Sequence, residues 1–460
     1  MRSFEATATF DCPRETLASW HFREGALERL VPPWSGVKVE KSLTEMRDGA
    51  VAVLRVPLGP LPLKARWEAV HEEVRPGQQF VDRMARGPFR AWRHLHRFGD
   101  LAGNAERSTL EDAISYELPF GPLGALGAGN VRAMLARTFA WRHRRTQLDL
   151  ARHAELSRAP KTIAISGASG LVGGALAAFL TTGGHRVHRL VRGAANAARG
   201  DIAWDPARGS VDLAALAECD AVVHLAGESI ASRWSAAKKA RILESRVRGT
   251  TTLANAIASV PNGPRVLVSA SAIGFYGDRG ADRIDESAST GSGFLADVCR
   301  AWEAATSPAA EAGVRVVNLR IGMVLSSAGA ALKALLTPFS LGLGGPVGSG
   351  RQGMSWIALD DLLAAVLFAI NTDALEGPVN AVGPAPCDNR TFGATLGRVL
   401  RRPAFLPLPS FAVSTIFGEM GRELLLGGAF VRPTRLFDAG FRFDHSTLES
   451  ALRFELGRFR

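Results

Sequence analysis

Three glycines spaced as GxxGxxG carry the strongest chemical signal in the sequence. They follow directly after an apolar segment, residues 162–166, and precede a segment of helical character at 175–181. Glycine lets the backbone turn sharply and approach a pyrophosphate, whose charge then lies at the helix N-terminus. This order predicts a dinucleotide-binding loop, with a plain tight turn as the alternative. The predicted cofactor loop consists of Gly167, Ala168, Ser169, Gly170, Leu171, Val172 and Gly173.

The next predicted strand, residues 186–191, indicates which dinucleotide the loop binds. An NAD site carries Asp or Glu about 20 residues after the loop, where it accepts a hydrogen bond from the ribose 2′-hydroxyl. Here the strand is followed by Arg192 and Gly193, with no acid. A carboxylate would repel a 2′-phosphate, whereas a guanidinium can bind one through two hydrogen bonds. The sequence therefore favours NADP(H) over NAD, and a surface arginine with no ligand role is the alternative.

The elements after residue 161 alternate as short apolar strands and helical stretches. Parallel strands that are buried on both faces and joined by crossover helices give this pattern, which predicts an α/β Rossmann-type doubly wound parallel sheet. The carboxyl ends of such strands form the crevice in which ligands bind. The predicted strands are 162–166, 186–191, 221–225, 265–269 and 314–319.

The first 155 residues follow a different order, with one strand, one or two helices, several more strands and one long helix at 123–153. This order predicts an α+β domain in which an antiparallel sheet curls around the long helix and leaves a cavity of ligand size. The predicted strands are 3–10, 37–43, 50–56, 65–73, 79–84, 91–98 and 108–117.

Composition excludes several classes of protein. Of the 460 residues, 47% are hydrophobic and 22% charged, as in an ordinary globular chain and unlike a disordered or fibrous one. No run approaches 18 apolar residues and the N-terminus lacks an apolar signal core, so we expect a cytoplasmic protein without a membrane span. Four widely separated cysteines predict reduced thiols rather than disulfides or structural zinc.

The formal charge of +11 raises the question of a polyanionic partner. The arginines are spread along the whole chain, and no zinc-finger, KH or RRM signature accompanies them. Compositional drift toward arginine together with an anionic small ligand is the favoured interpretation. We therefore expect a small-molecule substrate and no nucleic acid, with oligomeric state left open.

Residues 161–455 resemble the atypical short-chain dehydrogenase/reductases of the epimerase family, with a DUF1731-like C-terminal tail. The resemblance rests on specific blocks at 220–231, 233–239, 244–251, 269–277, 293–303, 342–352, 355–361 and 401–405. It implies that Leu225 and Ala226 line the adenosine and ribose and that Arg246 reaches the cofactor phosphates. It also implies that Met323 and Val324 approach the nicotinamide. Two further residues, Gly227 and Ser269, are assigned to the same cofactor site.

The sequence departs from the wider superfamily at the catalytic pair, a Tyr with a Lys four residues later that lowers the Tyr pKa. No YxxxK exists in the chain, and Leu295 and Cys299 stand where the pair is expected. Ser269 or Ser271 stands at the place of the family's substrate-positioning hydroxyl, and Tyr276 lies nearby. Ser271 and Tyr276 are the candidate catalytic residues, although Tyr276 more often packs against the sheet end, and Cys299 is a weaker candidate as a reactive thiol.

Two polar residues in the loop after the third parallel strand, Glu228 and Arg233, are candidates for orienting a substrate. The alternative, which we weigh equally, is that they only hydrogen-bond the loop.

The N-terminal region resembles the polyketide-cyclase/START-like (SRPBCC) helix-grip fold through segments 27–34, 86–98 and 111–119. The resemblance implies an apolar ligand in a cavity and no fixed chemistry. His94 and His96 lie two apart on a predicted strand and so share one face, which allows a metal site. Without a third ligand in view, a polar sheet face is the favoured interpretation, and we assign no metal.

Three domains are predicted, at 1–155, 161–395 and 396–460. The expected function is that of an NADP(H)-dependent oxidoreductase or epimerase of unknown substrate. The alternative is a non-catalytic NADP(H)- or ligand-sensing regulatory protein, because the Tyr–Lys pair is missing and some relatives carry a cell-division label.

Overall fold

The computed structural model describes residues 1–59, 63–119, 127–156 and 159–459. The chain forms two compact units, one of Met1–Ser157 and Ala177–His185, the other of Arg158–Leu176 and Arg186–Arg460. Among the described residues, no helix combines the length and the apolar character that crossing a membrane requires.

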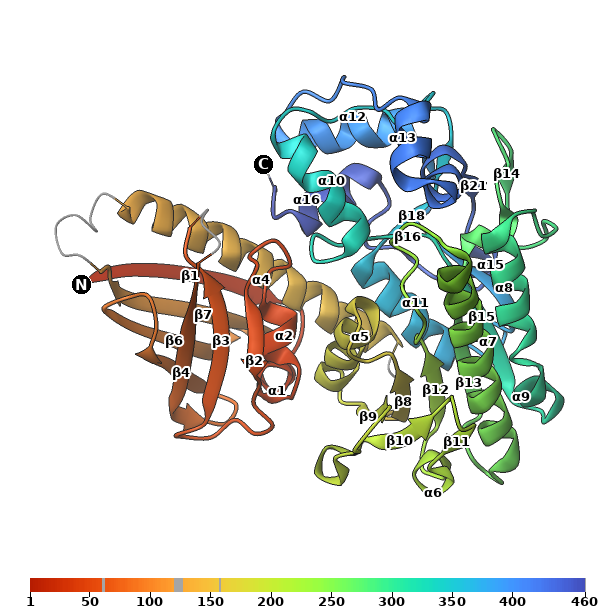
Figure 1. Ribbon diagram of the computed structural model, residues 1–460. Coiled ribbons are helices and arrows are strands. Elements are labelled where there is room, and N and C mark those ends of the chain that lie inside the picture. The colour runs from red at the N-terminus through yellow and green to blue at the C-terminus, as the bar shows by residue number, and fades with distance from the viewer. Residues whose placement is uncertain (60–62, 120–126, 157–158, 460) are drawn as a thin grey trace. The chain divides into compact units, whose positions relative to one another are not determined.

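The first unit holds a seven-stranded antiparallel sheet and one long helix (Figure 1). Its strands are ordered β1-β7-β6-β5-β4-β3-β2, and every pair of neighbours is antiparallel. The elements are β1 (Arg2–Phe10), α1 (Arg14–Phe22), α2 (Ala26–Leu30), β2 (Lys38–Lys41), β3 (Val51–Pro57), β4 (Lys64–Arg75), β5 (Gln79–Arg86), β6 (Ala91–Leu101), β7 (Asn104–Glu117) and α4 (Ala128–Leu156).

One face of this sheet is buried under α4. Burial alternates along β7, as the period of two in a strand requires. Leu135 and Phe139 of α4 pack with Phe4 of β1 and Ile114 of β7. The antiparallel sheet and the long helix confirm the expected α+β order, while the assignment to the START-like class stays a prediction. The predicted helix residues 123–126 lie outside the described residues.

The second unit is built on a parallel sheet. Seven of its eight strands are parallel, in the order β10-β9-β8-β12-β13-β15-β19, and β11 pairs antiparallel at one edge. The elements of the sheet and of its connections are β8 (Thr162–Ser166), α5 (Leu171–Thr182), β9 (Arg186–Val191), β10 (Ile202–Asp205), β11 (Ser210–Val211), α6 (Leu213–Ala217), β12 (Ala221–His224), α7 (Ala236–Ser259), β13 (Val266–Ala272), α8 (Phe294–Ala304), α9 (Ser307–Glu311), β15 (Arg315–Ile321), α11 (Leu359–Asn371) and β19 (Gly377–Ala381).

The strand order reverses between β8 and β12, which creates a crevice at the carboxyl ends of these two strands. Leu253 and Ile257 of α7 cover one face of the sheet and pack against Val222 and Leu267. The Rossmann-like prediction is confirmed. Helix α5 begins at Leu171 and not at the predicted residue 175. Gly173 and Gly174, which are typical of a loop in the sequence, lie in its first turn.

The C-terminal part of the chain adds a second layer of short elements to this unit. Leu396 and Leu452 pack with Leu325 and Trp356 in a core cluster of their own. The elements are β14 (Arg283–Ile284), β16 (Met323–Leu325), α10 (Ala330–Ser340), β17 (Gly353–Met354), β18 (Trp356–Ala358), β20 (Cys387–Asp388), α12 (Asn389–Leu400), α13 (Ser410–Phe417), α14 (Glu419–Gly421), β21 (Phe430–Val431), α15 (Thr434–Asp438) and α16 (Leu448–Glu455).

Candidate functional site

The glycine loop joins β8 to α5 in a tight turn. The Gly170 N–H donates to the Gly167 carbonyl at 2.9 Å, and Gly167 has a φ of 71°. A Cβ on Gly167 would lie 2.9 Å from the backbone nitrogen of Ala226, and one on Gly173 would lie 2.3 Å from the Gly167 carbonyl oxygen. Both positions therefore exclude any larger residue. The loop forms a cradle of bare backbone at the N-terminus of α5, which fits a pyrophosphate.

A single hydroxyl ties this loop to the end of β12. The Ser166 Oγ accepts hydrogen bonds from the N–H groups of Leu225 (3.1 Å) and Ala226 (3.3 Å). The same oxygen lies 2.6 Å from His224 Nδ1. Since it already accepts two hydrogen bonds, the Ser166 hydroxyl donates its own to this nitrogen, which requires a neutral His224 ring. Burial lowers the pKa of His224 to about 4, in agreement with this arrangement. Sequence reasoning assigned no role to Ser166 or His224.

Arg192 follows β9 directly, with its side chain exposed at the carboxyl end of the sheet. The next acidic residue along the chain is Asp201, directly before β10. Its carboxylate accepts a hydrogen bond from the Asn196 N–H at 3.1 Å. No carboxylate thus follows β9 at the position where an NAD site has one, and the residues present fit a 2′-phosphate.

Arg246 supports the loop after β12 from helix α7. Its Nη1 donates to the carbonyls of Glu228 (3.0 Å) and Ile242 (3.1 Å), and its guanidinium lies 4.8 Å from the centre of the Trp302 ring. A Cβ on Gly227 would lie 3.3 Å from this guanidinium, so the glycine leaves room for it. Burial lowers the pKa of Arg246. Arg246 therefore supports the loop after β12, and its predicted contact with the cofactor phosphates stays a prediction.

The two candidate substrate residues in this loop have different surroundings. The Glu228 carboxylate receives a hydrogen bond from Lys238 Nζ at 2.6 Å, which holds the pKa of that carboxyl below its usual range. The Arg233 side chain is exposed and passes close to Gly418. A Cβ added to that glycine would lie 3.5 Å from Arg233 Nε. The described structure shows no contact between Glu228 and Arg233, and their roles stay predictions.

A buried polar network occupies the ends of β13, β15 and β19. Both carboxylate oxygens of Glu303 accept from Arg320, through Nε and Nη2 at 2.9 Å each, and Oε1 also accepts from Ser271 Oγ at 2.6 Å. Arg320 Nη1 donates to the Tyr276 hydroxyl at 3.0 Å, which in turn donates to Asn380 Oδ1 at 2.8 Å. Ser271 is thus connected to a fully paired Glu–Arg ion pair.

The two candidate catalytic hydroxyls differ in their surroundings. Tyr276 is completely buried, and burial raises the pKa of its phenol. This placement gives Tyr276 a packing and positioning role and leaves its proposed proton transfer a prediction. Ser271 is 3% exposed, and its Oγ donates to Glu303 and lies in hydrogen-bond contact with the Cys299 thiol.

Leu295 and Cys299, which stand on α8 where the Tyr–Lys pair is expected, face Gly274. A Cβ on Gly274 would lie 3.2 Å from Leu295 Cβ and 3.8 Å from Cys299 Sγ. Burial raises the pKa of Cys299 to about 11, so its thiol is protonated at neutral pH. The structure therefore gives no support to a reactive thiol here.

The remaining predicted cofactor residues also lie in the second unit. Ser269 is fully buried on β13, in register with His224 of β12. Met323 and Val324 form β16, which pairs with β18 after β15 ends. The sequence analysis gave no role to Glu303 and Arg320. A buried arginine among the apolar residues of the strand 315–321, as at Arg320, is the signal that predicts such a buried partner.

A parallel sheet of this order, with a glycine loop at its switch point, defines a Rossmann-type dinucleotide-binding protein. Residues 163–382 match the NAD dependent epimerase/dehydratase family, and residues 408–455 match DUF1731, a domain of unknown function. An epimerase family protein of Mycobacterium bovis is 46% identical over 64% of this chain and 98% of its own length. The chain belongs to the epimerase family.

Two solved structures extend the comparison. A nucleoside-diphosphate sugar epimerase from Corynebacterium glutamicum is 33% identical, with a TM-score of 0.81, over 99% of this chain and 90% of its own. Human epimerase family protein SDR39U1, solved with NADPH, is 34% identical with a TM-score of 0.59, over 64% of this chain and 99% of its own. The likeness to the bacterial structure thus includes the first unit.

Removing the charge of Glu303 should destabilise the second unit strongly. The Arg320 and Glu303 side chains are only 5% and 14% exposed, so Glu303→Gln leaves a buried guanidinium unpaired. We expect a loss of about 3 kcal/mol in the free energy of unfolding, measured by urea titration. The control is Asp297→Asn on the same helix, whose pair with Arg300 is about 60% exposed and should cost less than about 1 kcal/mol. Equal losses in the two variants would show that the Glu303–Arg320 pair does not stabilise the second unit.

His224 should make the stability pH-dependent. Its pKa is about 4 in the folded protein and about 6.5 when unfolded, so the unfolded state binds more protons between these values. Stability therefore falls as the pH drops from 6.5 to 4, by up to about 3 kcal/mol. His224→Asn keeps an acceptor for Ser166 but cannot titrate, so its unfolding free energy should change less across this range. Parallel curves for the two proteins would rule out this role of His224.

Proposed function

We propose that the chain is an NADP(H)-dependent oxidoreductase or epimerase acting on a small-molecule substrate. The observation that carries the proposal is the backbone cradle of Gly167 and Gly173 combined with Arg192, and not an acid, after β9. The NADPH bound to human SDR39U1, a relative 34% identical, supports the choice of cofactor. The description of the Corynebacterium glutamicum structure supports a nucleoside-diphosphate sugar as one substrate class to test.

Each cofactor contact follows from the position of the residue. The loop 167–173 binds the pyrophosphate at the N-terminus of α5, and Arg192 binds the 2′-phosphate. Leu225 and Ala226 contact the adenosine and ribose, with Gly227 and Arg246 beside the phosphates. The buried Ser269 supports this wall from β13, and Met323 and Val324 lie at the nicotinamide end. When bound, NADP(H) donates or accepts a hydride.

Ser271 orients the reacting oxygen of the substrate. Its Oγ donates to Glu303 at 2.6 Å and so offers lone pairs to a substrate hydroxyl. A proton from that hydroxyl passes to Ser271 Oγ while the Ser271 proton moves to the Glu303 carboxylate, whose negative charge pairs with Arg320 before the transfer and is neutralised by it. Glu228 and Arg233 orient the rest of the substrate from the loop after β12. Tyr276 acts on the same network by holding Arg320.

The N-terminal unit supplies an apolar-ligand site in this proposal. A cavity of about 530 Å³ lies within it, lined by residues that include Trp34, Trp67 and Trp92. Such a cavity, between an antiparallel sheet and a long helix, supports the START-like assignment. We propose the domains 1–155, 161–395 and 396–460, and the cytoplasmic location stays a prediction.

A second candidate is a non-catalytic protein that senses NADP(H) or a ligand. The observation that favours it is the apolar surface of Leu295 and Cys299 where the Tyr–Lys pair is expected. Turnover of a carbonyl or sugar-nucleotide substrate that depends on Ser271 would exclude this candidate.

Reversing the charge at Arg192 should weaken NADPH binding selectively. Without the guanidinium, and with a carboxylate facing the 2′-phosphate, Arg192→Asp should bind NADPH about thirtyfold more weakly, or roughly 2 kcal/mol. NADH has no 2′-phosphate, so the affinity of the Arg192→Asp variant for NADH should fall less than its affinity for NADPH, or rise. Calorimetric titration of both nucleotides measures the change.

Arg189→Asp is the control, because its charge lies within β9 rather than after it. Equal loss of NADPH affinity in the two variants, or none in Arg192→Asp, would refute the assignment of the 2′-phosphate site.

A further inference from the structure

A cluster of histidines and carboxylates lies on one face of the first unit's sheet. Antiparallel register places Asp82 of β5 opposite His94 of β6, and Asp112 of β7 opposite His96 of β6. The sequence shows the histidine pair alone, because the alignment of neighbouring strands is not readable from spacing along one strand. The structure supplies the third ligand that the sequence analysis lacked.

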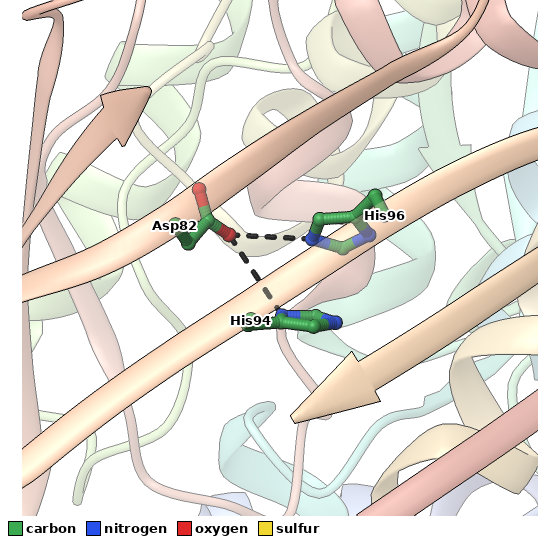
Figure 2. Close-up of side chains that lie close together, drawn as sticks. All are labelled: Asp82, His94 and His96. Carbon is green, nitrogen blue, oxygen red and sulfur yellow. Dashed lines mark hydrogen bonds and ion pairs between the residues drawn. The ribbon is translucent and has the colours of Figure 1, made fainter. Parts of the chain in front are cut away.

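Three potential metal ligands converge in this cluster (Figure 2). The Asp82 Oδ2 lies 3.9 Å from His94 Nδ1 and 3.3 Å from His96 Nε2. One ligand atom from each of the three residues lies within 4.8 Å of the others. A zinc ion with bonds of about 2.0–2.2 Å holds tetrahedral ligand atoms roughly 3.3 Å apart. An ion therefore fits between these atoms with small movements of the side chains.

A second carboxylate fixes the two histidines from behind. Asp112 Oδ1 lies 3.0 Å from His94 Nε2, in a hydrogen bond, and 2.8 Å from His96 Nδ1. Its other oxygen pairs with His143 Nε2 at 2.6 Å. Histidines that ligate metals typically give their second ring nitrogen to a carboxylate, as His94 does here, whereas His96 Nδ1 lies close to Asp112 without a hydrogen bond. Asp112 thus leaves His94 Nδ1 and His96 Nε2 facing Asp82.

Two carboxylates face the histidines of the cluster. Asp82 and Asp112 each lie within 4 Å of both His94 and His96. His71 Nε2 also lies 2.8 Å from Asp82 Oδ1. Nitrogen and carboxylate oxygen atoms in this arrangement suit a divalent cation.

The three candidate ligand residues lie in the wall of the apolar cavity of the first unit. Asp82, His94 and His96 line this cavity, together with apolar side chains such as Trp67 and Phe80. Asp112 and His143 do not line it, in keeping with a position behind the ligands. A site with three protein ligands on one side leaves coordination positions free toward the cavity.

We propose that Asp82, His94 and His96 bind one divalent transition-metal ion, Zn²⁺ or Fe²⁺, whose free positions face the apolar cavity. Two histidines and one carboxylate form a ligand set that both ions accept. The open positions would take an oxygen atom of an otherwise apolar ligand. The site belongs to the first unit alone and does not depend on the NADP(H) proposal.

Metal titration of the full chain tests this proposal. After chelator treatment and dialysis, Co²⁺ should bind one equivalent per chain with visible absorption bands, and Zn²⁺ should displace it. His94→Gln and Asp82→Asn should each weaken Co²⁺ binding at least a hundredfold. Asp112→Asn removes no ligand and should weaken it ten- to a hundredfold.

His21→Gln is the matched control, because His21 lines the same cavity but is not a proposed ligand. It should leave the Co²⁺ affinity and the stoichiometry unchanged. X-ray absorption of the Zn²⁺-loaded wild-type chain should show nitrogen and oxygen ligands, and this measurement needs no variant to fold. Absence of stoichiometric binding, sulfur ligation, or unchanged affinity in a correctly folded His94→Gln protein would overturn the proposal.

Discussion

The close approach of two backbone segments governs the architecture of the second unit. The loop after β8 and the loop after β12 meet where the sheet order reverses, and there is no space for a side chain at Gly167. The Ser166 hydroxyl accepts hydrogen bonds from two backbone N–H groups of the opposite loop and donates a hydrogen bond to His224. Because the Ser166 hydroxyl and both backbone N–H groups are paired, the two loops hold each other in place.

A buried ion pair performs a similar role at the neighbouring strand ends. Glu303 and Arg320 form two parallel hydrogen bonds, a geometry that fixes both side chains. Ser271 and Tyr276 attach to opposite ends of this pair. In the proposed reaction, the carboxylate of Glu303 would accept a proton through Ser271, in place of the missing Tyr–Lys pair. The position of Ser271 thus depends on contacts between α8 and β15 that lie outside the glycine motif.

Much of this organisation is readable from the sequence. The alternation of short apolar strands with helices predicted the Rossmann-like sheet, and GxxGxxG after an apolar strand placed the loop, because both signals are local. Helix α5 begins earlier than predicted, since Gly173 and Gly174 read as loop residues yet allow the close packing of the first turn. Local pattern also predicted the antiparallel sheet of the first unit.

The polar networks were not predicted, because they join residues far apart in the chain. Glu303 and Arg320 come from a helix and a strand, and Asp82 and His94 meet only through strand register. Spacing along one element cannot show such pairs. A charged residue at a buried position of a strand, as at Arg320, is the local sign that a partner must exist elsewhere.

The proposed function rests on NADP(H) binding in this crevice through the glycine loop and Arg192. A crystal structure of the full chain with NADPH would test this binding mode. We expect the pyrophosphate at the N-terminus of α5, the 2′-phosphate within hydrogen-bonding distance of the Arg192 guanidinium, and the nicotinamide beside Ser271. A nucleotide bound elsewhere, or with its 2′-phosphate directed away from Arg192, would contradict it.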